Sequence, residues 1–107
     1  MAAESRHILQ NAATTGNGTA VDTRQNGTEH TFYITASNDT VSAGKVKIET
    51  ARSDDYAGTW ALLGSEQTLV SNTTLIVQVT GCLMAVRARL SEEVTGGATC
   101  TVEYVSN

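Results

Sequence analysis

The sequence predicts an all-β fold: a single antiparallel β-sandwich or jelly-roll-like domain of about eight short strands. Segments of alternating apolar and polar residues recur along the 107-residue chain, which is typical of half-buried strands. Short runs of Gly, Asn, Asp, Ser and Thr separate these segments and indicate turns. No segment has the apolar stripe of a convincing helix, so strands are expected nearly throughout.

The N-terminal residues 1–15 are expected to form an extended arm, and residues 16–107 the sandwich domain. The arm is low in apolar content, so it would gain little by packing on the domain's own core. A short first strand near Ile8 is the alternative interpretation. Gly16-Asn17-Gly18 then predicts a tight hairpin turn, because Gly and Asn tolerate the positive φ angles of such turns.

The strands expected after this turn are defined by their period-two alternation. In residues 44–51, Val46 and Ile48 would face the core while Lys47 and Glu49 face solvent, as in a half-buried antiparallel strand. The predicted strands are residues 29–36, 44–51, 59–63, 74–80, 83–90 and 98–105.

Residues 83–90 have the sequence LMAVRARL. The alternation places Met84 and Val86 inward and Arg87 and Arg89 outward. Two outward arginines are usually a solvated stripe, but Arg also suits bidentate contacts to acidic groups on a neighbouring protein. Both interpretations remain open for this pair.

Trp60 is expected in the core, in phase with Leu62, because a half-buried aromatic ring fills a sandwich well. The alternative is an exposed Trp60 that stacks on a sugar ring. The two cysteines, Cys82 and Cys100, are expected to be buried or semi-buried free thiols. In a hairpin that turns near residues 95–97, Cys100 lies too far from Cys82 for a disulfide, and a reducing compartment disfavours the bond.

Composition excludes several classes of partner. The net charge of −4 argues against a nucleic acid or an anionic membrane held by charge. No apolar run approaches the length of a membrane span. The N-terminus lacks the apolar region of a secretory signal, so synthesis in a cytoplasm is expected.

No catalytic, cofactor-binding or metal-binding residues are predicted. His7 and His30 stand alone, without a second His or Cys at metal-ligand spacing. The adjacent carboxylate pairs at 54–55 and 92–93 would point to opposite faces of an extended segment, so neither forms a general acid/base couple. The sequence therefore predicts a protein that is not an enzyme.

Several motifs resemble those of small β-sandwich virion structural proteins of tailed bacteriophages, which are capsid decoration (cement) proteins or head or tail accessory domains. The shared features are a Gly-x-Gly-Thr-Ala opening, a Gly-x-Trp-x-x-Leu middle and a Val-Arg-Ala-Arg strand before a Gly-containing turn. The chain departs from the pattern at DTRQNGTEH and SDDYAG. The matching residues are Gly16, Gly18, Thr19, Ala20, Val21, Asp22, Trp60, Leu63, Gly81, Val86, Arg87, Ala88, Arg89, Gly96 and Gly97.

The resemblance implies a non-enzymatic decoration protein on the capsid exterior that stabilises contacts between coat subunits. Its partner would be the major capsid protein of the same virion, with self-association as a trimer or dimer. The alternative is a tail or baseplate domain that binds a host-surface glycan. A glycan-acting enzyme would need a carboxylate pair that the sequence does not place. The residues expected to contact a partner are Arg6, His7, Ile8, Leu9, Arg87 and Arg89.

Overall fold

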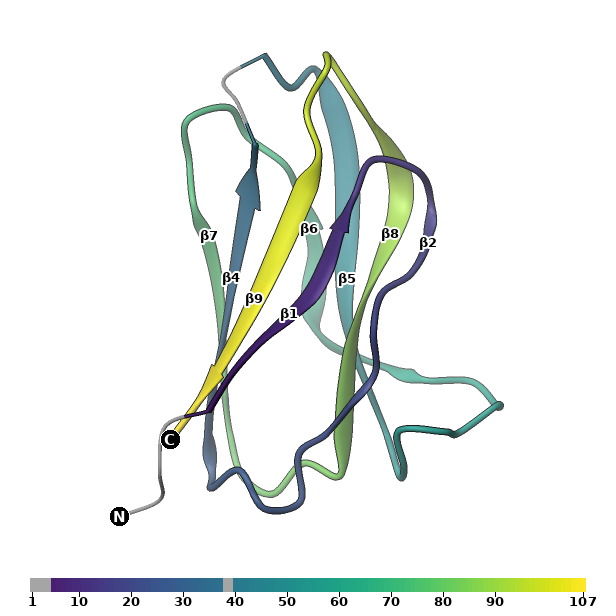
Figure 1. Ribbon diagram of the computed structural model, residues 1–107, viewed down its shortest axis with the longest axis vertical. Coiled ribbons are helices and arrows are strands. Elements are labelled where there is room, and N and C mark those ends of the chain that lie inside the picture. Colours follow the sequence, from purple (N-terminus) through teal and green to yellow (C-terminus); the bar gives the residue numbers. More distant parts are fainter. Residues whose placement is uncertain (1–4, 38–39) are drawn as a thin grey trace.

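The computed structural model describes residues 5–37 and 40–107. These residues form nine strands in two antiparallel sheets, the sandwich that the sequence predicts (Figure 1). None of the described segments is a helix long and apolar enough to cross a membrane. The strands are β1 (Ser5–Ala12), β2 (Gly16–Asn17), β3 (Val21–Asp22), β4 (Glu29–Ala36), β5 (Ala43–Ala51), β6 (Ala61–Thr68), β7 (Leu75–Thr80), β8 (Ala85–Thr95) and β9 (Cys100–Ser106).

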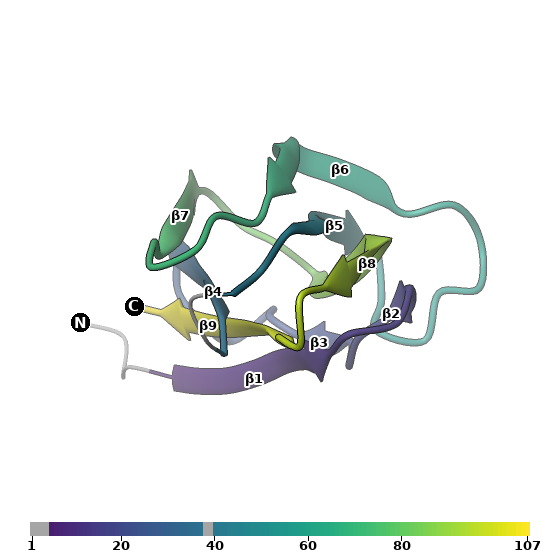
Figure 2. The ribbon, with the colours of Figure 1, turned by 90° about the horizontal axis from the view of Figure 1, so that it is seen from above.

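The two sheets form two layers. Sheet 1 has the strand order β1-β9-β4-β7, and sheet 2 has the order β2-β8-β5-β6, with β3 also paired to β8. Figure 2 shows β1 and β9 in one layer and β5 and β6 in the other. The strands β4, β9, β5 and β8 are the inner strands of the two sheets, so each has a partner on both sides.

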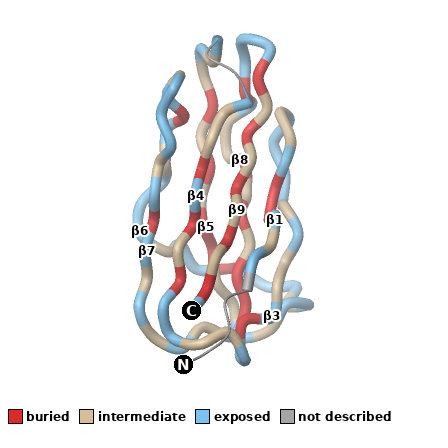
Figure 3. Tube along the Cα trace, turned by 60° about the vertical axis from the view of Figure 1, so that its left-hand side comes forward, coloured by how far each residue is buried: buried red, intermediate tan, exposed pale blue. Residues whose placement is uncertain are grey.

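The core lies between these inner strands, where buried residues alternate with exposed or half-buried ones (Figure 3). Phe32 and Ile34 of β4 face Val46 and Ile48 of β5 across the sandwich, and all four are fully buried. Tyr104 of β9 is the largest fully buried side chain. The inward positions predicted by alternation in β4, β5 and β9 are therefore confirmed.

Two residues expected inward are exposed instead. Met84 is exposed because β8 begins only at the next residue, so the alternation does not extend to it. Leu62 is also exposed. It lies opposite Glu49 in the β5–β6 register, which places it on the outer face of sheet 2.

Residues 5–12 are a strand of the sandwich rather than part of an arm. They form β1, which pairs with β9 from Ser5↔Ser106 to Ala12↔Cys100, and Leu9 is buried in the core. One inward leucine and backbone pairing with β9, interrupted only between Ile8 and Gln10, hold this edge strand of mostly polar residues. The domain therefore begins before residue 16, and residues 1–4 lie outside the described residues.

The Gly16-Asn17-Gly18 segment is not a simple hairpin turn, because it carries the chain from sheet 1 to sheet 2. Gly18 N donates to Ala88 O of β8 at 2.7 Å, and Thr19 N donates to Leu9 O of β1 at 2.7 Å. A Cβ on Gly18 would overlap the Leu9 carbonyl oxygen and lie 3.1 Å from the Ala88 oxygen. Glycine is required here by this close backbone approach. We call this side of the sandwich, bordered by β1 in sheet 1 and by β2 and β3 in sheet 2, the closed side.

The opposite side is bordered by β6 and β7. Among the described residues, no backbone hydrogen bond joins these two strands. They approach near Gly64, where a Cβ would lie 3.6 Å from Val77 Cγ1. We call this the open side.

Candidate functional site

Across 5–37 and 40–107, no three His, Cys, Asp or Glu side chains gather in a way that could hold a metal ion. The outer faces of the two sheets are therefore the surfaces to consider for binding.

The outer face of sheet 1 has a row of side chains that crosses all four strands. Ile8 of β1 lies opposite Glu103 of β9, Glu103 lies opposite Tyr33 of β4, and Tyr33 lies opposite Ile76 of β7. Ile8, Tyr33 and Ile76 are 54%, 36% and 56% exposed. We call these four residues the transverse row.

The charge within the transverse row is partly neutralised. Arg6 Nη1 lies 3.6 Å from Glu103 Oε1, and Arg6 is on β1 next to Ile8 on the same face. This face of sheet 1 therefore presents three apolar or aromatic side chains beside the Arg6–Glu103 ion pair. Exposed apolar side chains gathered in this way are typical of interaction sites.

A shallow depression of about 210 Å³ lies between β4 and β7, beside the transverse row. The side chains that point outward there are polar, and in the strand register Thr31 and Gln78 are the neighbours of Tyr33 and Ile76. Most of the side chains that line the depression are polar, which suits a polar ligand. Its lining residues are Glu29, His30, Thr31, Gln78, Val79 and Thr80.

The outer face of sheet 2 is built around Glu49 of β5, which points outward as expected but is buried rather than exposed to solvent, because Arg87 and Arg89 cover its carboxylate. Arg87 Nε donates to Glu49 Oε1 at 2.9 Å, and Arg89 Nε lies 3.4 Å from Glu49 Oε2. The Arg87 guanidinium carbon lies 4.4 Å from the centroid of the Trp60 ring, in a cation–π contact. We call these four residues the Glu49 cluster.

Trp60 is buried as predicted, with 5% exposure. It lies beneath Arg87 on the outer side of sheet 2, and not within the central core cluster. Its indole Nε1 donates to the Tyr56 carbonyl at 2.9 Å. A ring covered on this side cannot stack on a sugar, so the structure argues against Trp60 as a glycan-binding residue.

The two predicted arginines differ in what remains accessible. The Arg87 side chain is 17% exposed and the Arg89 side chain 38%. Arg87 is engaged by Glu49 and Trp60 and therefore contributes to the fold. Arg89 is the arginine of the pair that retains surface for a partner.

The four N-terminal residues predicted to contact a partner are divided by the pleat of β1. Ile8 and Arg6 lie on the outer face, whereas Leu9 packs in the core and the His7 ring stacks on Tyr104 at 6.2 Å. The structure thus brings Arg6 and Ile8 together on sheet 1 and places the two arginines of β8 on sheet 2. Tyr33 and Ile76 were not predicted, because only the strand register shows that they lie in line with Ile8.

His30 has a structural role in the core. It is buried, its Nδ1 lies 2.5 Å from the Tyr104 hydroxyl, and its Nε2 lies 2.9 Å from the Gly81 carbonyl oxygen. A carbonyl can only accept, so Nε2 donates to the Gly81 oxygen. Burial raises the pKa of the Tyr104 hydroxyl.

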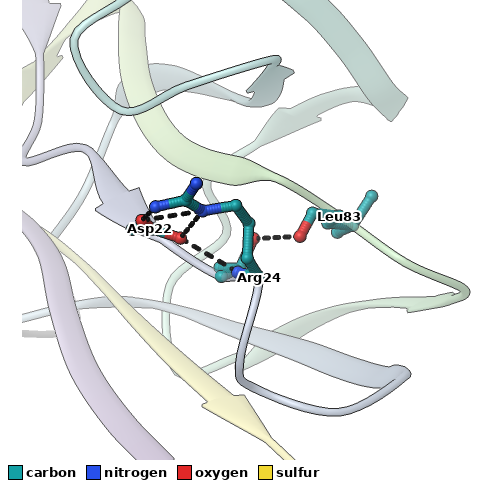
Figure 4. A network of polar contacts seen from close by, with 4 residues as sticks. Asp22, Arg24 and Leu83 are labelled. Carbon is teal, nitrogen blue, oxygen red and sulfur yellow. Dashed lines mark hydrogen bonds and ion pairs between the residues drawn. The ribbon is translucent and has the colours of Figure 1, made fainter.

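The segment that leaves β3 is fixed by polar contacts (Figure 4). Arg24 makes a bidentate contact to Asp22, with Nη2 2.6 Å from Oδ2 and Nε 3.0 Å from Oδ1. This hydrogen bonding lowers the pKa of the Asp22 carboxyl. Thr23 Oγ1, between them, donates to Leu83 O at 2.7 Å and joins this segment to the start of β8.

Both cysteines are free thiols, as predicted. Cys100 is buried, and burial raises its pKa to about 11. Cys82, expected to be at least half-buried, is exposed, because it lies in the loop between β7 and β8.

No family model matches the chain, and no curated protein matches it. Among solved structures, the crystal structure of SPBc2 prophage-derived protein YomS is similar, with a TM-score of 0.71 and 18% sequence identity. The match covers 97% of this chain and 92% of that chain. At this identity the likeness shows a shared fold over nearly the whole length, and function must be argued from the surface.

Proposed function

We propose that the chain is a non-enzymatic structural protein of a bacteriophage virion, most specifically a capsid decoration protein on the outer capsid surface. The observation on which this rests is the transverse row, in which three partly exposed apolar or aromatic side chains and the Arg6–Glu103 ion pair cross the outer face of sheet 1. The similarity of the fold to a prophage-derived protein supports a phage origin.

In this proposal sheet 1 lies flat on neighbouring coat subunits. Ile8, Tyr33 and Ile76 would be removed from water, a gain of roughly 25 cal/mol per Å² of apolar surface. The Arg6–Glu103 ion pair beside them would set the orientation of the domain. A protein that binds only the assembled coat stabilises it in proportion to its occupancy.

The test uses capsids of the encoding phage that lack this protein, incubated with the purified chain and imaged by cryo-electron microscopy. We expect density on the capsid exterior and a strong loss of occupancy for Ile8→Lys. Leu62→Lys is the matched control, because Leu62 is an exposed apolar residue (45%) on the opposite face. Absence of density with the unmodified chain, or equal losses for both variants, would disprove the proposal.

A second candidate is a tail or baseplate domain that binds a host-surface glycan. The polar depression beside the exposed Tyr33 ring favours it, because sugars bind by stacking on aromatic rings with hydrogen bonds at their edges. A glycan array decides between the two. In the glycan case Gln78→Ala should abolish array binding and Ile8→Lys should preserve it, whereas a decoration protein should bind no glycan.

A further inference from the structure

Among the described residues the sandwich has five edge strands, and four of them are protected against pairing with another chain. β1 has a register irregularity between Ile8 and Gln10, and Thr19 N already bonds its Leu9 carbonyl. β2 and β3, which both pair with β8, have only two residues each. β6 has an irregular register against β5 and a positive φ of 69° at Gly64. Irregularities, short length and coverage are the usual means by which edges are blocked.

β7 has none of these features. Its sequence, LIVQVT, contains no charge, glycine or proline, and its pairing with β4 runs without a shift from Glu29↔Thr80 to Ile34↔Leu75. It is the last strand of sheet 1, at the left border of Figure 1. In the part of the chain that the structure describes, β4 is the one strand that pairs with it. Half of its backbone donors and acceptors therefore face outward without a strand partner.

We propose that β7 pairs antiparallel with β7 of a second copy of this chain, joining the two copies of sheet 1 into one continuous sheet. The inference concerns the purified chain and does not depend on the proposed function. A second copy fits this edge because a two-fold axis places the same uncharged strand opposite itself. A charged edge would instead oppose like charge to like charge.

The pleat restricts the register of such a pair. Residues directly opposite each other in an antiparallel pair point to the same face. Val77 faces the core and Ile76 faces out, so inward residues must oppose inward residues. Registers centred on Val77 or on Gln78 satisfy this condition. In the first, Ile76 of one copy lies opposite Gln78 of the other, and the two transverse rows meet at the new seam.

Self-association is measured by sedimentation velocity over a dilution series. We expect a concentration-dependent dimer for the unmodified chain and a monomer for Ile76→Lys, because the substitution introduces a charge into an otherwise uncharged strand at the seam. Because Ile76 is mostly exposed, circular dichroism should show an unchanged fold. The matched controls are Leu62→Lys on β6 and Ile8→Lys on β1, and both should still dimerise.

A chain that is monomeric at every concentration would overturn the proposal, and so would loss of the dimer in Ile8→Lys, which indicates stacking of sheet faces instead. Loss of the dimer only in Leu62→Lys would assign the interface to β6. Since Ile8→Lys should lose capsid occupancy while it keeps the dimer, failure of the proposed function and failure of the β7 pairing are distinguishable.

Disulfide crosslinking between cysteines introduced into β7 tests the register of the β7–β7 pair. In a Cys82→Ser background, a mixture of Ile76→Cys and Gln78→Cys chains should form a disulfide-linked heterodimer if Val77 is at the centre. Gln78→Cys alone should crosslink if Gln78 is at the centre, because directly opposed Cβ atoms are within disulfide reach. Absence of both products under oxidising conditions would contradict the pairing.

Discussion

The two sides of the sandwich are built differently. On the closed side, the segment after β1 donates hydrogen bonds to both sheets, through Gly18 N to Ala88 O and Thr19 N to Leu9 O. On the open side, among the described residues, β6 and β7 share no backbone hydrogen bond. The closed side cannot accept a further strand, whereas the open side presents β7 with its outward backbone groups unpaired by any strand. One side therefore holds the fold together, and the other is available for association.

The largest effect on stability is expected from a substitution at Gly18, where backbone atoms of β1 and β8 approach closely. In Gly18→Ala the new methyl group overlaps the Leu9 carbonyl oxygen, so both inter-sheet hydrogen bonds must break or the strands must separate. We expect a loss of about 4 kcal/mol or more in the free energy of unfolding, measured by urea denaturation. The control on the open side is Gly64→Ala, where there is space and only the positive φ adds strain, at a cost of about 1–2 kcal/mol. Equal losses in the two variants would remove the distinction between the sides.

A smaller effect is expected from truncating an apolar side chain on each border of sheet 1. Leu9 on β1 is buried in the core, so Leu9→Ala should cost about 3 kcal/mol. Ile76 on β7 is exposed, so Ile76→Ala should change the stability of dilute protein by less than about 0.5 kcal/mol. Thermal melting at low concentration measures both. If Leu9→Ala leaves the melting temperature unchanged, β1 is an arm that the fold does not need.

The smallest effect on stability is expected from the thiols. Cys100 is buried next to the closed side, whereas Cys82 is exposed in the loop after β7. Cys100 lies opposite Ala12 of β1, and its pKa is raised from 9.0 to about 11 by burial. The folded state holds this proton more tightly than the unfolded state, so its contribution is intact below pH 9 and is lost between about pH 9 and 11. We expect the unmodified chain to lose about 1–2 kcal/mol over this range relative to Cys100→Ala. If the free energy of unfolding depends on pH identically in the two proteins, the pKa of Cys100 is not raised by folding.

The same thiols can be counted with a colorimetric reagent at neutral pH. Cys82, in the loop after β7, is exposed and should react in the folded protein. Cys100 should react only after unfolding. Rapid reaction of both thiols would mean that the β1 border opens readily.

Much of the fold could be predicted from the sequence because the inner strands alternate clearly. Val46 and Ile48 were assigned inward from pattern alone, and the structure agrees. The N-terminal strand was mistaken for an arm because one buried leucine gives a weak pattern. Trp60 was correctly expected to be buried, but its partner Arg87 and its place outside the central core could not be inferred, since cation–π contacts have no periodicity.

The binding surface was less predictable for a different reason. The transverse row combines Ile8, Tyr33 and Ile76, which are far apart in the chain and are aligned only by the register of four strands. The role of Gly18 likewise depends on backbone atoms of residues 9 and 88. Sequence patterns report local alternation and turns, whereas both features depend on non-local pairing.

Amide hydrogen exchange followed residue by residue at several protein concentrations tests most directly the claim that one side is closed and the other associates. The amides of Gly18 and Thr19 should be protected at every concentration, because their hydrogen bonds belong to the single chain. The alternate amides of β7 that do not bond to β4 should exchange rapidly in dilute protein and become protected as the concentration rises. Rapid exchange at Gly18, or protection in β7 that does not change with concentration, would contradict the account.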